Sequence, residues 1–380
     1  MSFKHYNEYD AYIEKINYLK EFLDKYASLP KQGSIQWLAN RTSTIGGSEM
    51  SILEGNNPYK DLRGLVMSKL GWDTFKGNIA TNWGKIFEPI TQRVLELLFK
   101  CQLYEASSLP GCIEGTSYSP DGFAVALTET IISLIFNDYI VDHELPTSDA
   151  ISILFEIKSP YKRIPDNHIP LIYLSQPKSG LCHFPFLDIA YFVDVAYRKC
   201  KIDAVDDNYD FSFHNDKERL EGHIVEGFIG VYNVKDVYHT ETSVVDFGMS
   251  HYYDMLQMSN NIDNHVWDCY NSEPIFVKDS ICDENEIFVN EINVNEIIYN
   301  NKEQFLCFCE KNDYSPIGYL KYKGFNLKII PVYREPDFVI NLAPEVKKVL
   351  RVIDLIKKAP NQQETFDNIF KNWIKKAPTM

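Results

Sequence analysis

The segments FEIKSP at positions 155–160 and SPDG at positions 119–122 contain the most informative pattern in this chain. Residues 151–157 form an apolar run with β-branched members that stops at Ser159-Pro160, so the run predicts a short buried strand. Side chains alternate along a strand, which places Glu156 and Lys158 on one face and Ile157 on the other. A carboxylate and an ammonium at the end of a buried strand are costly unless they have a partner or a chemical role.

Asp121 lies in the turn-forming string SPDG, immediately before a second apolar segment at 123–127. Two acids with a nearby lysine can hold a hard divalent cation and position a water molecule for attack on phosphorus. The alternative is that Glu156 and Lys158 form an ordinary ion pair on one strand face. The order and spacing of the other motifs must decide between the two interpretations.

Length and composition limit the class of protein. A chain of 380 residues, 45% hydrophobic and 24% charged, fits one large globular domain with extensions or two domains. The net charge of −15 argues against non-specific coating of DNA, although a local basic groove would still hold phosphates. We expect an intracellular protein with free thiols, because no run could span a bilayer, residues 1–20 lack a signal-peptide core and the eight cysteines show no C-x-x-C pair.

A second motif lies near the start of the chain. The sequence predicts a helix that carries Trp37 and Arg41, then a turn at Gly46-Gly47, with Ser48 near the start of the next helix. A helix N-terminus flanked by an arginine is a natural site for a phosphate group. The alternative is a capping serine beside a solvated arginine.

Together these motifs resemble the PD-(D/E)XK nucleases and, among them, the lambda-type (YqaJ-like) alkaline exonucleases of phages and large DNA viruses. Asp121 followed by Glu156-Ile157-Lys158 resembles the nuclease signature. In lambda-type enzymes a tryptophan, an arginine four residues on and a serine seven residues after it hold this place, and Trp37, Arg41 and Ser48 reproduce that spacing. The resemblance covers residues 37–260, most strongly as far as Gln176.

The resemblance implies an α/β fold with a PD-(D/E)XK restriction-endonuclease-like core, a central mixed sheet flanked by helices, and N- and C-terminal extensions. We expect a helical extension over 1–34, the nuclease core over 35–260 and an α/β extension of unknown role over 261–380. Residues 131–150 depart from the short hairpin of the family and predict an inserted strand or helix with a loop. The patterns at 305–309 and 327–333 predict strands, and the pattern at 344–358 predicts an amphipathic helix.

The resemblance also implies a metal site. Asp121, Glu156 and the carbonyl of Ile157 would bind the cation, and Glu88, from a G-x-x-x-E helix motif, would help at a second ion or through water. Lys158 would orient or deprotonate the attacking water. The expected cofactor is Mg²⁺, with Mn²⁺ as a substitute and two ions per site. On local sequence alone, Glu88 could equally be an exposed helix glutamate.

The family's 5′-phosphate pocket maps onto four positions: Arg41, Ser48, Ser119 and Gln176. Gln176 belongs to the string Y-x-x-Q, and because Pro177 follows, we expect it in the first turn of a helix. Ser119 could instead be a turn-forming serine before proline. Lys162 and Arg163 could reach the DNA backbone or belong to a solvated loop.

The implied activity is metal-dependent 5′→3′ digestion of one strand of duplex DNA, for recombination, repair or replication. The implied partners are duplex DNA with 5′-phosphate ends, a single-strand annealing protein and further copies of the chain, with no membrane. If the protein is viral, the host cytoplasm or the site of viral DNA replication is expected. The alternatives are a structure-specific endonuclease or RNase on the same fold, or a non-catalytic nucleic-acid-binding homologue.

Overall fold

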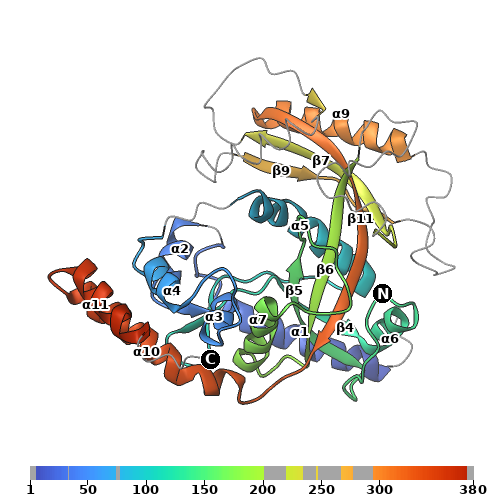
Figure 1. The fold of residues 1–380 in the computed structure, drawn as a ribbon. Helices are drawn as coiled ribbons and strands as arrows, with labels where there is room; N and C mark the ends of the chain where they lie inside the picture. The colour runs from blue at the N-terminus through green and yellow to red at the C-terminus, as the bar shows by residue number, and fades with distance from the viewer. Residues whose placement is uncertain are drawn as a thin grey trace.

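A mixed β-sheet lies at the centre of the computed structural model, which describes residues 6–32, 34–73, 78–200, 220–233, 245–246, 267–276 and 294–374 (Figure 1). Within these ranges the sheet has eight strands in the order β10-β7-β11-β6-β5-β4, with β8 beside β11 and β9 beside β7. The strands are β4 (Gly122–Leu127), β5 (Ala150–Lys158), β6 (Ile189–Cys200), β7 (Val225–Asn233), β8 (Val245–Asp246), β9 (Trp267–Asn271), β10 (Ile275–Phe276) and β11 (Ser315–Val332).

The register of three neighbouring strands places the motif residues. β4 pairs antiparallel with β5, so Gly122 lies opposite Phe155 and the Asp121 turn lies beside the end of β5. β5 pairs parallel with β6, where Lys158 lies opposite Asp194. The predicted buried strand at 151–157 is therefore confirmed, and its continuous apolar run reflects burial of β5 on both faces.

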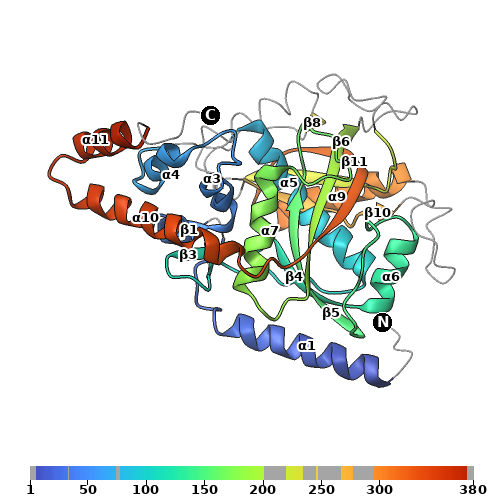
Figure 2. The same cartoon turned by 60° about the horizontal axis from the view of Figure 1, so that its bottom comes forward.

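Helices cover both faces of the sheet, as Figures 1 and 2 show. Helix α5 (Ile79–Phe99), capped by Asn78, packs on the face that carries Ile153 and Phe155. Helices α1 (Tyr6–Asp24) and α7 (Leu171–His183) pack on the other face, beside Leu154. Alternation along β5 therefore turns Glu156 and Lys158 toward the α7 side. The expected α/β fold, a mixed sheet flanked by helices, is confirmed.

A smaller lobe is built from early segments of the chain together with helices from its end. It contains α2 (Ile35–Arg41), the 3₁₀ turn η1 (Gly47–Glu49), α3 (Met50–Leu53), α4 (Leu62–Lys69) and a small sheet of β1 (Ile45–Gly46), β2 (Leu109–Pro110) and β3 (Thr116–Tyr118). Helix α10 (Phe338–Lys358) packs on α3, α4 and α11 (Gln362–Ile374) through an apolar face. The predicted amphipathic helix at 344–358 is confirmed, and it begins earlier, at Phe338.

Two further predictions have clear outcomes. The insertion between Asp121 and Glu156 contains a helix, α6 (Thr128–Phe136), followed by a loop. The predicted strand at 305–309 is wrong, because these residues lie in helix α9 (Val294–Asn312). Phe305 and Cys309 are both buried four residues apart, which is the helical period, and a window of five residues could not separate that pattern from alternation.

The last third of the chain contributes to the central sheet. β11 lies between β6 and β7, pairing antiparallel with both, so the strand predicted at 327–333 is the end of a longer one, 315–332. Part of the segment 261–380 thus completes the core sheet, while the boundaries at 34 and 260 stay predictions. The sequence also predicts a polar surface loop at 203–221, a strand at 237–245 and a helix at 249–259. Apart from residues 220, 221 and 245, these segments lie outside the described residues. Among the described helices, none is both long enough and apolar enough to cross a membrane.

Candidate active site

Two carboxylates meet where β4 begins and β5 ends. Oδ2 of Asp121 accepts a hydrogen bond of 2.7 Å from the backbone N–H of Ile157, which fixes the Asp121 carboxylate against the neighbouring strand. The side chain of Glu156 is fully buried, and its Oε2 accepts a hydrogen bond of 3.1 Å from the Tyr118 hydroxyl. Both acids are therefore held in place by the sheet and by β3.

The ammonium of Lys158 lies among three oxygens. It donates to Oε1 of Glu156 and, over 2.9 Å, to the carbonyl of Ile157, and it lies 3.6 Å from Oδ2 of Asp121. The structure thus brings together the three groups expected to bind a metal ion, around a positive charge that the chain itself supplies.

This donor set fits Mg²⁺. Two carboxylates and a peptide carbonyl are hard oxygen ligands, and Mg²⁺ commonly takes one or two carboxylates and completes its octahedron with waters and substrate phosphate. Within the described ranges, no three Asp, Glu, His or Cys side chains gather in metal-binding geometry. The carbonyl of Ile157 and ligands from outside the chain would therefore have to complete the coordination.

Glu88 lies on α5, half-buried, within electrostatic range of the same site. Burial and the charge of Asp121 raise the pKa of Glu88 to about 8, and the Lys158 ammonium opposes that rise. The exposed-glutamate alternative is therefore wrong. Whether Glu88 assists a second ion stays a prediction.

Burial also controls the charge of the central pair. Burial and the negative charge of Asp121 raise the pKa of Glu156 to about 8, against the opposing effect of Lys158. Burial alone would lower the pKa of Lys158, but Glu156 and Asp121 outweigh it and the pKa lies well above its ordinary value. Lys158 therefore stays positively charged, and the protonation of Glu156 is the variable one.

A second polar site lies in the small lobe. Nη2 of Arg41 donates to Oγ of Ser48 over 3.3 Å, and the guanidinium lies 4.7 Å from the centre of the Trp37 ring. Gly47 precedes Ser48 and passes very close to β3, since a Cβ at this position would lie 2.5 Å from the Tyr118 ring. Only glycine allows this approach. The predicted helix with Trp37 and Arg41 is confirmed as α2, and Ser48 lies in η1, just before α3. The predicted turn at Gly46-Gly47 is only partly right, because Gly46 belongs to β1 and the turn begins at Gly47.

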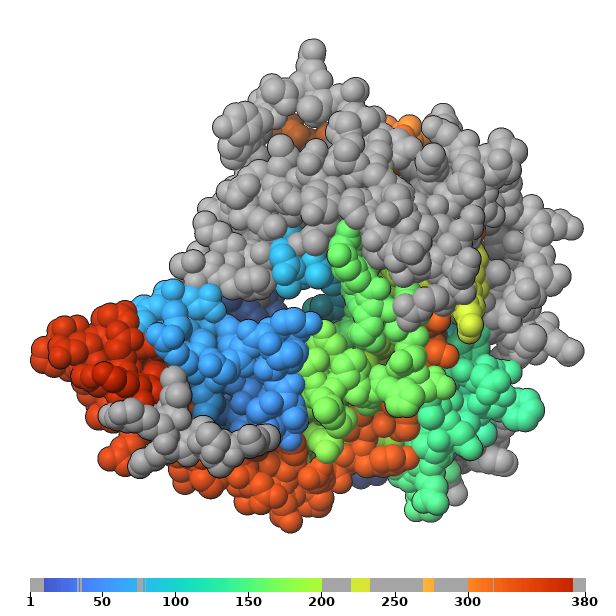
Figure 3. All heavy atoms as spheres, viewed as in Figure 1, coloured from blue at the N-terminus to red at the C-terminus, as the bar shows by residue number. Residues whose placement is uncertain are grey.

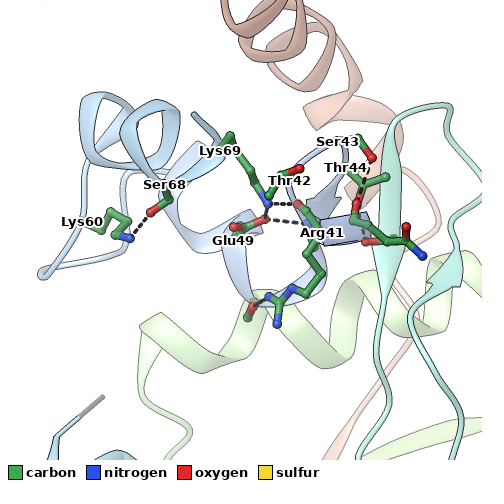
Figure 4. A network of polar contacts seen from close by, with 12 residues as sticks. Arg41, Thr42, Ser43, Thr44, Glu49, Lys60, Ser68 and Lys69 are labelled. Carbon is green, nitrogen blue, oxygen red and sulfur yellow. Dashed lines mark hydrogen bonds and ion pairs between the residues drawn. The ribbon is translucent and has the colours of Figure 1, made fainter. Parts of the chain in front are cut away.

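A buried lysine orders the turn that carries Arg41 and Ser48, as Figure 4 shows. Nζ of Lys69 donates to the carbonyl of Arg41 over 2.7 Å and lies 2.6 Å from Oε2 of Glu49, which also accepts from the backbone N–H of Gly46. None of the motifs in the sequence pointed to this network. The signal was present, because Lys69 follows Leu65 and Val66 at helical spacing and so falls on the buried face of α4.

Ser119 and Gln176 enter the same region from two other elements. Ser119 directly follows β3, and Gln176 lies on α7, and both elements pack against η1. The expectation that Gln176 lies in the first helical turn is wrong, because α7 begins at Leu171 and Gln176 is its sixth residue. All four residues assigned to the phosphate pocket lie on elements that meet, and their joint role stays a prediction.

The two loop cations differ from each other. Lys162 is exposed, while Arg163 donates to Oδ2 of Asp194 and lies 5.9 Å from the Tyr173 ring centre. Asp194 is fully buried, and it belongs to none of the motifs in the sequence. An aspartate inside the apolar run 189–197 was the signal that could have identified it.

The surface is hollowed where these elements meet. Figure 3 shows the hollow between the blue segments of the small lobe, the start of α5 and the green segments that include α7. These are the elements that carry the Arg41–Ser48 pair, Glu88 and Gln176.

Residues 36–177 match the family model of the YqaJ-like viral recombinase domain, which confirms the resemblance seen in the motifs. One protein of African swine fever virus is 28% identical to this chain in the strain Badajoz 1971 Vero-adapted and 27% identical in the isolate Tick/Malawi/Lil 20-1/1983. Each alignment covers 367 residues, 92% of this chain and 94% of the viral protein. Among solved structures, the alkaline exonuclease LHK-Exo from Laribacter hongkongensis aligns with 16% identity and a TM-score of 0.29, over 43% of this chain and 74% of that one.

Proposed function

Because residues 36–177 match a YqaJ-like viral recombinase domain, we propose that this chain is a metal-dependent exonuclease that degrades one strand of duplex DNA from its 5′ end. One observation supports the proposal above the others. The oxygens of Asp121, Glu156 and Ile157 converge on one cationic group at the end of a rigid strand. An ordinary surface ion pair would not recruit a second carboxylate and a backbone carbonyl.

Each residue of the site would have a separate role in hydrolysis. Asp121, Glu156 and the Ile157 carbonyl would hold Mg²⁺, which when bound acidifies water and neutralises charge on the phosphate. Lys158 is permanently charged, so it would orient the attacking water and stabilise the negative charge that develops on the phosphoryl oxygens. Glu88 would accept a proton or a hydrogen bond from water at the edge of the site.

The Arg41–Ser48 pair would set the direction of digestion. An arginine fork and a hydroxyl at a helix start are suited to a terminal phosphate, which carries more charge than an internal phosphodiester. Ser119 and Gln176 would complete this pocket. With the 5′-phosphate anchored there, the scissile bond would fall at the acidic site, giving 5′→3′ hydrolysis in DNA recombination, repair or replication. An annealing protein would be a natural partner for the single strand that remains.

The first test is an assay on end-labelled linear duplex DNA. We expect release of mononucleotides in Mg²⁺ or Mn²⁺ and none in EDTA, because the carboxylates alone cannot acidify water. Covalently closed circular duplex and single-stranded RNA of the same sequence serve as controls. Cleavage of the circle would point to an endonuclease, cleavage of the RNA to an RNase, and activity that persists in EDTA would exclude the metal mechanism.

We expect Mg²⁺ binding to strengthen as pH rises from 6 to 8.5. Burial raises the pKa of Glu156 and of Glu88 to about 8, so both bind protons at pH 6 that a cation must displace. These folded-state pKa values exceed the ordinary 4.5. The free energy of unfolding of the metal-free protein should therefore fall as the pH rises towards 8 and level off above it. Calorimetry in two buffers with different ionisation enthalpies measures the protons released. Binding that is independent of pH would contradict the assignment.

A further inference from the structure

Lys158 occupies the oxygens that the proposed function gives to the metal ion. Its ammonium contacts Glu156, the carbonyl of Ile157 and, at 3.6 Å, Asp121. An ammonium and a divalent cation repel each other and cannot share these ligands at contact distance. Binding of the metal therefore requires the charged end of Lys158 to move. Because the Lys158 side chain is only 23% exposed, the displaced ammonium needs another acceptor.

Asp194 lies directly beside Lys158. The two residues are partners in the parallel β5–β6 ladder, so their side chains leave the sheet on the same face, with strands about 4.8 Å apart. The Lys158 charge is close enough to act on Asp194, where it opposes the effect of burial on the Asp194 pKa. The flexible four-carbon stem of a lysine can span the gap between adjacent strands.

Asp194 has one carboxylate oxygen in use and one available. Oδ2 accepts from Arg163, while Oδ1 is buried and has no hydrogen-bond partner among the described residues. Nη2 of Arg163 is likewise buried without a partner in the described part of the chain. Buried carboxylate oxygens are normally hydrogen-bonded, so an acceptor left open beside a lysine calls for an explanation.

The surroundings provide a short path between the two positions. The Tyr173 ring on α7 lies 5.6 Å from Nζ of Lys158 and 5.9 Å from the guanidinium carbon of Arg163. An aromatic face attracts a cation as it crosses from one acceptor to the next. Lys158 and Arg163 thus both lie next to the Tyr173 ring, and Asp194 is the carboxylate that both of them could contact.

We propose that Asp194 is a positioning residue that receives the Lys158 ammonium when a divalent cation binds to Asp121, Glu156 and the Ile157 carbonyl. Arg163 holds the Asp194 carboxylate in place through Oδ2 and leaves Oδ1 for the lysine. The exchange rests on the proposed metal site. It separates the charges into two groups, the metal with its carboxylates and Asp194 with two cations. An ammonium that donates to one oxygen of Asp194 keeps two further N–H groups, which would serve the attacking water and the phosphate.

A double-mutant cycle on Mg²⁺ affinity tests the exchange. Calorimetry without DNA would compare wild type, Asp194→Asn, Lys158→Met and the double variant. We expect Asp194→Asn to weaken Mg²⁺ binding about tenfold in the wild-type background, because the displaced ammonium loses its acceptor. In the Lys158→Met background the same substitution should have no effect on affinity, since no ammonium must move.

Two controls separate the possible failures. Asp188→Asn removes another ion-paired aspartate, which is the partner of Lys15 and directly precedes β6, and it should leave Mg²⁺ affinity unchanged. Thermal melting identifies any variant that fails to fold. If Asp194→Asn does not fold, the double variant Arg163→Gln/Asp194→Asn replaces it, because it removes both members of the ion pair and leaves no unpaired arginine. Equal weakening by Asp194→Asn in both backgrounds would make Asp194 a metal ligand or a structural group, which overturns the exchange alone. Absence of Mg²⁺ binding in all forms would overturn the proposed function, and the exchange with it.

Discussion

Glu156→Gln and Lys158→Met should each reduce the rate of DNA hydrolysis by about a hundredfold or more, which is typical for loss of one group that stabilises a transition state. Gln has the shape of Glu but cannot supply a negative charge to a cation, and Met keeps the apolar stem of Lys without its charge. The measurement is the single-turnover rate on 5′-phosphorylated linear duplex in saturating Mg²⁺.

The matched controls are Glu345→Gln and Lys348→Met. These residues form an exposed ion pair on α10, at 3.1 Å, with the same chemistry and a different environment. Exposed pairs contribute little, so both controls should hydrolyse DNA at the wild-type rate. If Glu156→Gln or Lys158→Met retained near wild-type turnover while folded, the pair would be structural and the active-site assignment would fail.

Local patterns in the sequence were enough to predict which candidate site residues share a strand face, whereas much of the sheet around them depends on distant contacts. The apolar run ending at Glu156-Ile157-Lys158 and the turn at Asp121 are local patterns, and strand alternation fixes which side chains share a face. That the two segments are neighbours followed from the family resemblance. The antiparallel register of Gly122 with Phe155 agrees with it.

What the sequence could not give depends on distant contacts. β11 is separated from β6 by more than a hundred residues, and nothing in its pattern states which strands it will join. The pairing of Arg163 with Asp194 and the link from Lys69 to Glu49 connect different elements, so they need the tertiary structure. The wrong prediction of a strand at 305–309 had another cause. A short aromatic segment fits both the helical and the strand period, and the residues that pack against it determine which structure forms.

Arg41→Ala should remove most of the preference for phosphorylated ends. In the wild-type protein we expect faster initial hydrolysis of duplex with a 5′-phosphate than of the same duplex with a 5′-hydroxyl. A charged hydrogen bond to phosphate is worth about 1.5–3 kcal/mol, so loss of Arg41 should lower the rate on the phosphorylated end by roughly 10- to 100-fold. The rate on the hydroxyl end should change far less, since no terminal phosphate is present to bind.

The comparison between the two ends distinguishes an anchor for the terminus from a general contact with the backbone. Arg41 contacts Ser48 and the face of Trp37 and lies outside the cluster of oxygens around Lys158, so Arg41→Ala should leave Mg²⁺ affinity unchanged. Arg351→Ala, an exposed arginine on α10, is the control for loss of one positive charge. Equal slowing on both ends would make Arg41 a backbone contact, and the exonuclease assignment would then lose its support over an endonuclease. If Arg41→Ala still discriminated between the two ends, the phosphate pocket would have to lie outside the small lobe.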